Sequence, residues 1–246
     1  MRLIIDPDPG TPSWNMAVDE ALLNSDAPLT LRFYCWSPHG LSLGYFQDDL
    51  DDEALKHWND LNVQVVRRLT GGGAILHGEE ITYSLTGPDG QFPFDGHVDQ
   101  SYKLVHDTLI KSLQEMGVPA AYAGKSPSAL KRHEQPFFCF TRSTCLDILA
   151  QDRKLVGSAK RRRNKRVLQH GSIVLAPHPH GGPMASVQEW CPVPPDVGDL
   201  MRQLGSQIAD ELQLSIEPTS LADNVLNSAH LIELEKYFDH RRRPKR

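Results

Sequence analysis

Three features that separate classes of protein are scarce in this sequence: cysteine, long apolar runs and an excess of basic charge. Four cysteines occur among 246 residues and none forms a Cys-x-x-Cys pair, which argues against a disulfide framework, and we expect no bound metal. No apolar run approaches the roughly 20 residues that span a bilayer. At the N-terminus, Asp6 and Asp8 stand where a signal peptide carries its apolar stretch. These absences predict a cytoplasmic protein with reduced thiols and no membrane segment.

The charge balance excludes a globally basic nucleic-acid binder, because the formal net charge is −5. Basic residues nevertheless gather in two runs, KRRRNKR over 160–166 and HRRRPKR over 240–246. Such runs are usually solvated loops or tails. The alternative is a patch that docks an acidic macromolecule, and the residues alone leave both possibilities open.

Length and composition suit one large globular domain, because 246 residues with 39% apolar side chains can bury a sizeable core. We expect a single globular domain over 1–246, with its core in 1–195 and a helical C-terminal segment and basic tail in 196–246.

The apolar spacing predicts an α+β fold. Alternating or β-rich segments at 2–5, 30–36, 41–46, 63–68, 74–76, 81–85, 145–149, 154–158 and 167–175 indicate strands. Helical spacing appears at 13–24, 51–59, 101–116, 197–212 and 221–238, with Ser13 as the expected N-cap of the first helix. Because no strand–helix–strand rhythm repeats, we expect a largely antiparallel or mixed sheet.

The segment Arg67-Arg68-Leu69-Thr70-Gly71-Gly72-Gly73 is the most informative stretch of the chain. Successive glycines let backbone N–H groups approach a ligand closely and form an anion-binding concavity. Two arginines just upstream are able to offer forked donors to a phosphate or carboxylate. A glycine-rich β-turn with solvated arginines would look the same, and no Gly-Lys-Ser/Thr follows as in a P-loop. His77 is equally compatible with a structural role and with a ligand contact.

Four segments in order resemble the lipoate–protein ligase and octanoyltransferase family, which shares its catalytic domain with biotin–protein ligases. They are NMAVDEALL (15–23), LRFYCWSPHGLSLGYFQ (31–47), RRLTGGGAILHGEEITYSL (67–85) and DRKLVGSAKRRRNKRVLQHGSIVL (152–175). The resemblance implies a central mixed β-sheet, a smaller sheet and surrounding helices around an acyl tunnel. It implies that Lys154 contacts the acyl carbonyl or an adenylate. The substrate-binding residues that it implies are Arg67, Arg68, Thr70, Gly71, Gly72, Gly73, His77, Gly157, Ser158, Ala159, His170 and Gly171.

The family uses two mechanisms, and a suitable thiol distinguishes them. Ligases activate lipoate with ATP and Mg, whereas octanoyltransferases form a cysteine thioester and need no cofactor. Cys139 lies in a loop 15 residues before Lys154, and nearby cations, Arg142 among them, would favour its thiolate. This arrangement resembles a branch whose acceptor is glycine cleavage system H protein. Cys145 lies in a strand-like run, and we expect it to be packing.

We therefore predict an acyltransferase that moves an octanoyl or lipoyl group from acyl carrier protein to a lipoyl-domain protein, the glycine cleavage H protein or a dehydrogenase E2 subunit. The roughly 50 residues after Pro195 leave little room for the accessory domain of many ligases, which favours the thioester route. Two positions depart from the pattern: Gly73, where the branch often has arginine, and Lys160, where the family usually has glutamine. The alternatives are an ATP-dependent lipoate ligase and a non-catalytic module that binds lipoate or lipoyl domains.

Overall fold

The protein is described by a computed structural model that covers residues 1–124, 137–139, 144–182, 184–193 and 195–238. Its centre is an eight-stranded sheet in the order β11-β1-β2-β6-β10-β9-β8-β7. The strands are β1 (Arg2–Ile5), β2 (Thr30–Tyr34), β6 (Glu80–Pro88), β7 (Ala120–Tyr122), β8 (Ile148–Ala150), β9 (Arg153–Arg163), β10 (Arg166–Val174) and β11 (Glu217–Pro218). β1 pairs in parallel with β2 and β11, and the other neighbours are antiparallel, so the sheet is mixed.

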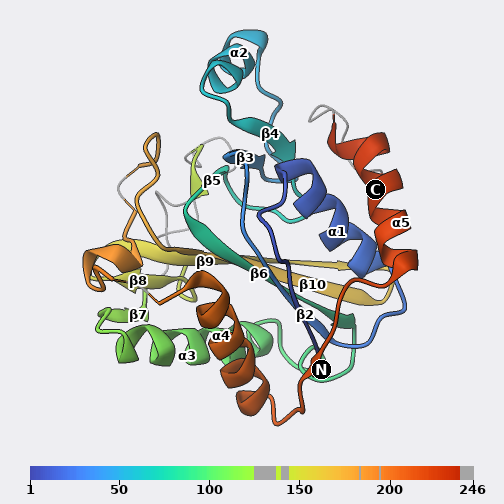
Figure 1. Ribbon diagram of the computed structural model, residues 1–246, viewed down its shortest axis with the longest axis vertical. Coiled ribbons are helices and arrows are strands. Elements are labelled where there is room, and N and C mark those ends of the chain that lie inside the picture. The colour runs from blue at the N-terminus through green and yellow to red at the C-terminus, as the bar shows by residue number, and fades with distance from the viewer. Residues whose placement is uncertain (125–136, 140–143, 183, 194, 239–246) are drawn as a thin grey trace.

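A three-stranded sheet, β4-β3-β5, lies above the large one in Figure 1. It consists of β3 (Gly40–Leu43), β4 (Gln64–Arg67) and β5 (Ile75–His77), and β3 is parallel to β4 but antiparallel to β5. The predicted α+β class, with a mixed central sheet, a smaller sheet and surrounding helices, is confirmed.

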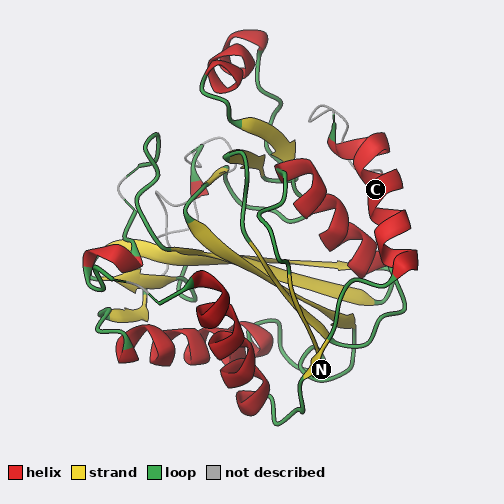
Figure 2. Ribbon diagram, in the orientation of Figure 1, coloured by secondary structure: helices red, strands yellow, loops and turns green. Residues whose placement is uncertain are grey.

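Helices cover both faces of the large sheet (Figure 2). On one side lie α3 (Gln100–Glu115) and α4 (Val197–Glu211), and on the other lie α1 (Pro12–Asn24) and α5 (Asp223–Ile232), which continues as η4 (Glu233–Tyr237). Helix α2 (Asp52–Asp60) packs on the small sheet, and η3 (Val187–Glu189) is a single 3-10 turn. The segment after residue 195 contributes to the apolar cores through α4 and α5.

Apolar and hydroxyl side chains alternate along strand β6, so the strand has one polar face inside the fold. Ile81, Tyr83 and Leu85 belong to the main apolar core, whereas Thr82 and Ser84, which alternate with them, are buried polar side chains. Since successive side chains of a strand point to opposite faces, one face of β6 packs against the apolar core and the other presents hydroxyl groups.

Three local predictions need correction. The first helix begins one residue earlier than expected, and its N-cap is Thr11, whose hydroxyl accepts from the N–H of Trp14. The run over 160–166 is not a loop, because β9 extends to Arg163 and pairs with β10 across a tight turn. The strand expected at 145–149 begins only at Ile148, and Cys145 is exposed instead of packed.

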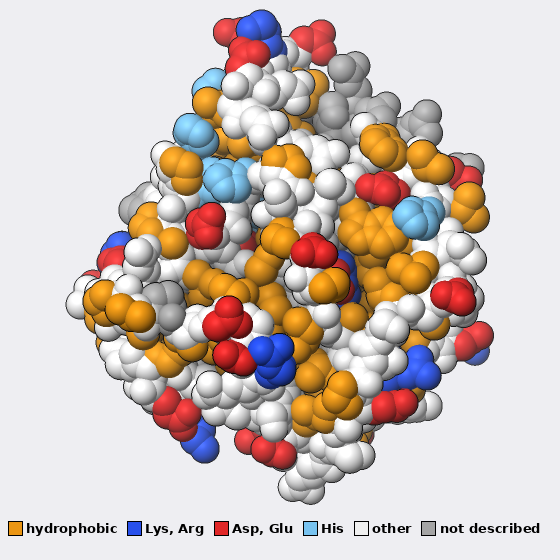
Figure 3. Space-filling model, in the orientation of Figure 1, with side chains coloured by type: hydrophobic (Ala, Val, Ile, Leu, Met, Phe, Trp, Pro, Cys, Tyr) orange, Lys and Arg blue, Asp and Glu red, His pale blue; other side chains and the backbone are white. Residues whose placement is uncertain are grey.

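Charged side chains are scattered over the face seen in Figure 3, where acidic and basic groups alternate without a large patch of one sign. The basic run at 240–246 lies outside the described residues. Within the described ranges, no helix has the length and apolar character needed to cross a membrane.

Candidate active site

A cavity of about 390 Å³ lies where the glycine turn and the small sheet face β9 and β10. Met16, Tyr34, Trp36, Ile75 and Phe138 form its apolar lining. Most of the residues that the sequence analysis selected also line it: Arg68, Gly71, Gly72, Gly73, His77, Cys139, Lys154, Gly157, Ser158, Ala159, His170 and Gly171. Segments far apart in the chain are therefore brought to one cavity, and of the selected residues only Arg67 and Thr70 are not in its lining.

Arg68 shapes the glycine turn and does not present a free fork to a ligand. Its Nη2 donates to the carbonyls of Gly71 (2.8 Å) and Gly73 (2.7 Å), its Nη1 to the Ser42 carbonyl (2.8 Å), and its Nε to Thr70 Oγ1 (3.2 Å). The side chain is buried, and burial lowers the pKa of Arg68 to about 10. Each nitrogen of the guanidinium thus has a partner in the protein, so its role is to hold the turn.

Arg67 points away from the cavity. Its Nη1 donates to the carbonyls of Gly44 (2.9 Å) and Gln47 (2.8 Å), and its Nη2 lies 2.5 Å from Asp49 Oδ1. The adjacent arginines lie on opposite faces because they follow an extended strand. The structure therefore places Arg67 outside the lining of this cavity, and its role in substrate binding stays a prediction.

The third glycine makes room for Cys139. The backbone of Phe137–Cys139 forms a bridge to Ala74, with N–H to carbonyl distances of 2.7 Å (Ala74 to Phe137) and 2.8 Å (Cys139 to Ala74). A Cβ at Gly73 would lie 2.8 Å from the Cys139 nitrogen and 2.9 Å from the Phe137 oxygen. The departure at Gly73 thus has a structural reason: no side chain fits where the backbone of Cys139 passes.

Substituting Gly73→Ala is therefore expected to displace Cys139 and to lower catalytic turnover on the order of 10²-fold, since small misplacements of a reacting group are that costly. Gly71→Ala is the matched control, because its Cβ would only touch the Phe46 ring at 3.7 Å. Steady-state kinetics of the two variants and of the wild type measure this difference in turnover. Equal activity of the two variants would show that the close approach at Gly73 is unimportant.

Cys139 lies beside a buried ion pair. Lys154 Nζ is 3.9 Å from Cys139 Sγ and 2.8 Å from Asp147 Oδ2. Lys154 and Asp147 are 3% and 4% exposed, so their attraction is little screened by water. The Thr144 N–H also donates to Asp147 Oδ2 at 2.6 Å. An ammonium held at this place is able to stabilise a thiolate or an oxyanion.

Asp147 is a site residue that the sequence analysis missed. Its signal was a single carboxylate inside the apolar run CLDIL, seven residues before Lys154. Such a residue cannot be assigned from spacing, because strand alternation does not tell whether it faces solvent or a buried cation.

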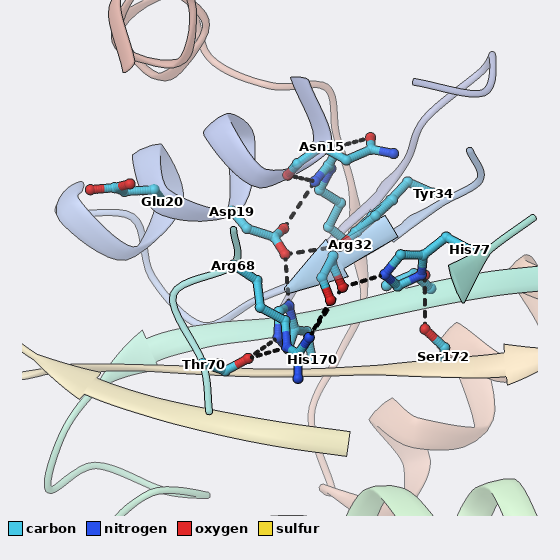
Figure 4. A network of polar contacts seen from close by, with 12 residues as sticks. Asn15, Asp19, Glu20, Arg32, Tyr34, Arg68, Thr70, His77, His170 and Ser172 are labelled. Atoms are coloured by element: carbon cyan, nitrogen blue, oxygen red, sulfur yellow. Dashed lines mark hydrogen bonds and ion pairs between the residues drawn. The ribbon is translucent and has the colours of Figure 1, made fainter. Parts of the chain in front are cut away.

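Thr70 and His170 belong to a buried polar network that ties the turn to α1 and to the large sheet (Figure 4). His170 Nε2 is 2.7 Å from Thr70 Oγ1, and its Nδ1 is 3.3 Å from Asp19 Oδ2. Asp19 also accepts from Arg32 Nη1 at 2.9 Å. Burial alone would raise the pKa of Asp19, but the hydrogen bond from His170 and the charge of Arg32 lower it. The carboxylate therefore stays ionised and anchors His170.

His77 has a partner on each ring nitrogen. Its Nδ1 is 2.7 Å from Glu80 Oε1, and its Nε2 is 2.7 Å from Ser42 Oγ. The ring stacks on Trp36, with 3.8 Å between centroids, and burial lowers its pKa. It is thus a structural histidine that also lines the cavity, and a contact with the ligand stays a prediction.

Gly171 on β10 lets Ser158 and Tyr83 pack closely beside the cavity. A Cβ at Gly171 would lie 2.2 Å from Ser158 Oγ and 2.7 Å from the Tyr83 ring.

Lys160 lies farther along β9, where its ammonium donates to the Val98 carbonyl (2.6 Å) and to Ser101 Oγ (2.5 Å). Burial lowers the pKa of Lys160 to about 8. The lysine found in place of the family's usual glutamine thus anchors the start of α3.

Two comparisons of the sequence place these residues among known proteins. The model of the lipoyl protein ligase A/B catalytic domain matches residues 11–209. Octanoyltransferase LipM of Moorella thermoacetica is 40% identical over 179 residues, which are 70% of this chain and 64% of that protein. The Bacillus subtilis octanoyltransferase LipM is 33% identical over the same fractions of both chains. The chain thus aligns with slightly less than two thirds of the length of these relatives.

Solved structures show the same fold. Protein Ta0514 from T. acidophilum with bound lipoic acid superposes with a TM-score of 0.77 at 20% identity, covering 99% of both chains. Lipoate-protein ligase A bound with ATP gives a TM-score of 0.76 at 20% identity, covering 98% of this chain and 97% of the other. At such identities the likeness supports the fold alone.

Proposed function

The chain belongs to the lipoyl protein ligase A/B catalytic domain family, and we propose that it is a cysteine-dependent octanoyltransferase of that family. Its donor is octanoyl-acyl carrier protein and its acceptor is a lysine of a lipoyl-domain protein, such as glycine cleavage H protein or a dehydrogenase E2 subunit. The similarity to octanoyltransferases LipM supports this choice of activity.

One observation carries the proposal: Cys139 Sγ lies on the cavity wall, 3.9 Å from the ammonium of Lys154. A thiolate is the nucleophilic form of cysteine, and a neighbouring cation favours it. Asp147 Oδ2 lies 2.8 Å from the same ammonium, so the cation is oriented before any substrate arrives.

The reaction follows in two steps. The Cys139 thiolate attacks the donor's thioester carbonyl, the bond between Sγ and the acyl carbon forms, and the carrier leaves as a thiol after taking up a proton. The neutral amine of the acceptor lysine then attacks the new thioester, the amide C–N bond forms as the bond between the acyl carbon and Sγ breaks, and the proton that the amine loses passes to the Cys139 thiolate or to water. Lys154 is the donor that stabilises oxyanion charge in both tetrahedral intermediates. Because the donor is already a thioester, this route requires neither nucleotide nor metal.

The cavity suits a medium-length alkyl chain. Its volume of about 390 Å³ falls in the range of small-molecule sites, and Met16, Tyr34, Trp36 and Ile75 supply apolar surface. The polar groups that face it, such as His77 and Thr82, bond to one another through Glu80. An acyl chain that lies against His77 and Thr82 therefore leaves neither side chain without a hydrogen-bond partner.

Intact-mass spectrometry tests the proposal directly. Purified protein is incubated with octanoyl-acyl carrier protein, and separately with octanoate, ATP and Mg²⁺. We expect an octanoyl adduct, sensitive to hydroxylamine and located on Cys139, in the first incubation only. Acylation of an acceptor that occurs only with ATP would favour a lipoate ligase, and no acylation in either incubation would favour a binding module.

The exposed charges of the β9–β10 hairpin are expected to steer an acidic carrier protein towards the site. Arg163 is unsuited to this role because its ion-pair partner Glu20 is buried. Arg162 and Lys165 are exposed, and the ion pair of Arg162 with Asp89 (3.5 Å) lies at the surface, where water screens it. Replacing Arg162 and Lys165 by glutamine should raise KM for the carrier with little change in kcat, because rim charges act on association. The increase should fade with added salt, since the screening length is about 10 Å at 0.1 M.

The control for the hairpin variant removes two exposed lysines elsewhere, Lys56 on α2 and Lys111 on α3. Both variants lose two positive charges, so a general effect of net charge would change KM equally in both. Unequal KM values at low salt, with the larger increase in the hairpin variant, support local steering. The same KM in wild type and hairpin variant would contradict it.

A further inference from the structure

His106 on α3 is a buried histidine that the proposed reaction does not use. It is 1% exposed, and its Nδ1 lies 2.7 Å from the carbonyl oxygen of Leu146. On the other side of the ring, Nε2 lies 2.7 Å from Ser158 Oγ and 3.2 Å from Tyr83 OH. The ring therefore bridges α3, the cavity wall of β9, and the residue that precedes Asp147.

The direction of each hydrogen bond follows from the chemistry of the partners. A carbonyl oxygen only accepts, so His106 Nδ1 carries the proton and donates to Leu146. Burial lowers the pKa of His106 to about 4, which leaves the ring neutral near pH 7 and makes Nε2 an acceptor. Ser158 Oγ then donates to Nε2, and Tyr83 OH, 2.7 Å from Ser158 Oγ, donates to that oxygen. Only one tautomer of His106 satisfies all partners.

The bond to Leu146 constrains Asp147 through a single peptide plane. The Leu146 carbonyl and the Asp147 N–H belong to the same planar unit, so holding one orients the other. The Asp147 N–H donates to the Thr144 carbonyl at 3.1 Å, and the Asp147 carbonyl accepts from Ala123 N–H at 2.9 Å. The backbone of Asp147 is thus held on both sides, with its carboxylate directed at Lys154.

We propose that His106 is a positioning residue: by donating to the Leu146 carbonyl, it keeps the Asp147 carboxylate, and with it the Lys154 ammonium, in place beside Cys139. The inference rests on the proposed function, because it assigns the ammonium its role at the thiol. His106 itself touches neither Cys139 nor Lys154 by any hydrogen bond among the described residues. The charged and titratable groups around its ring are Tyr83, Tyr102, Asp107, Tyr122, Asp147 and Lys154. The charged groups that face the Cys139 thiol are Lys154 and Arg68.

Two substitutions separate the contacts of the ring. In His106→Asn the amide nitrogen occupies the place of Nδ1 and keeps the donor to Leu146. In His106→Gln the longer amide reaches the place of Nε2 and keeps an acceptor for Ser158, while the donor to Leu146 is lost. A merely structural histidine would make both variants equally defective.

The measurement is the rate at which iodoacetamide alkylates Cys139 across pH, followed by peptide mass and needing no acyl substrate. For His106→Gln we expect the half-maximal rate to shift upward by about one pH unit, because a cation near the thiolate is no longer held. Its transfer kcat should fall roughly 10–100-fold, as for other groups that orient a functional residue. His106→Asn should resemble the wild type in both readouts. Equal shifts in the two variants, at equal melting temperature, would overturn the proposal.

Failure of this inference and failure of the proposed function have different signatures. If carrier-bound octanoate never acylates Cys139 but the two variants alkylate differently, the positioning role stands and the transferase proposal falls. If acylation occurs and the two variants alkylate at the same rate across pH, the transferase proposal stands and the positioning role falls. If His106→Gln does not fold, His106→Asn and Tyr83→Phe serve as the test, because both variants keep a hydrogen-bond donor to the Leu146 carbonyl. A shifted alkylation profile in His106→Asn would then reject the proposal.

Discussion

Replacing Cys139 by serine is expected to abolish octanoyl transfer. A hydroxyl at this position remains protonated near pH 7, so the neighbouring ammonium at 3.9 Å has no thiolate to stabilise. The loss should be on the order of 10³-fold or more, as when a covalent nucleophile is removed. The measurement is octanoylation of an acceptor lipoyl domain, together with the melting temperature, which should stay near that of the wild type because serine is almost isosteric.

Cys145→Ser is the matched control for this experiment. Cys145 is exposed, lies six residues away and does not line the cavity, so its replacement should leave transfer unchanged. Full activity of Cys139→Ser would reject the thioester route and favour activation by ATP. A loss in both variants would indicate that the substitutions disturb the segment and not the chemistry.

Replacing Lys154 by methionine should lower turnover on the order of 10²–10³-fold, the usual effect of losing one donor to an oxyanion. The same variant should be less stable, because it leaves Asp147 buried without its cation. Breaking a buried pair typically costs about 3–5 kcal/mol of unfolding free energy. Denaturant unfolding and steady-state kinetics measure the two effects separately.

The double variant Lys154→Met with Asp147→Asn distinguishes catalysis from stability. Asparagine removes the unpaired charge, so most of the lost stability should return, while turnover stays low because no ammonium is restored. If turnover returned together with stability, Lys154 would be a structural residue. A loss of turnover below about threefold in the single variant would lead to the same conclusion.

Local sequence patterns were sufficient to predict the fold class and to select many residues that line the candidate site. The fold class follows from elements whose apolar spacing is strong, such as β10 and α3, because burial of one face requires that spacing. The glycine turn alone did not distinguish a binding site from an ordinary β-turn, but together with three other segments in order it indicated the family. The structure brings Cys139 and Lys154, which the sequence analysis selected, to one cavity, and their chemical roles remain predictions.

Long-range contacts decided what these patterns left open. Arg67 and Arg68 looked equivalent in the sequence, yet the extended backbone sends one to the loop at 44–49 and the other into the turn. The basic run after Ala159 resembled a solvated loop, but pairing with β10 makes most of it a strand. Neither outcome is encoded in spacing, because both depend on which segment lies next to the residue.

The ion pair and its histidine are the clearest example of what only tertiary structure decides. Asp147, Lys154 and His106 come from the turn before β8, from β9 and from α3, and each alone is an ordinary polar residue. A short-range pattern reports the period with which side chains alternate between surface and core. It carries no information about partners 40 residues away, such as Leu146 for His106, because those are set by how sheet and helices pack.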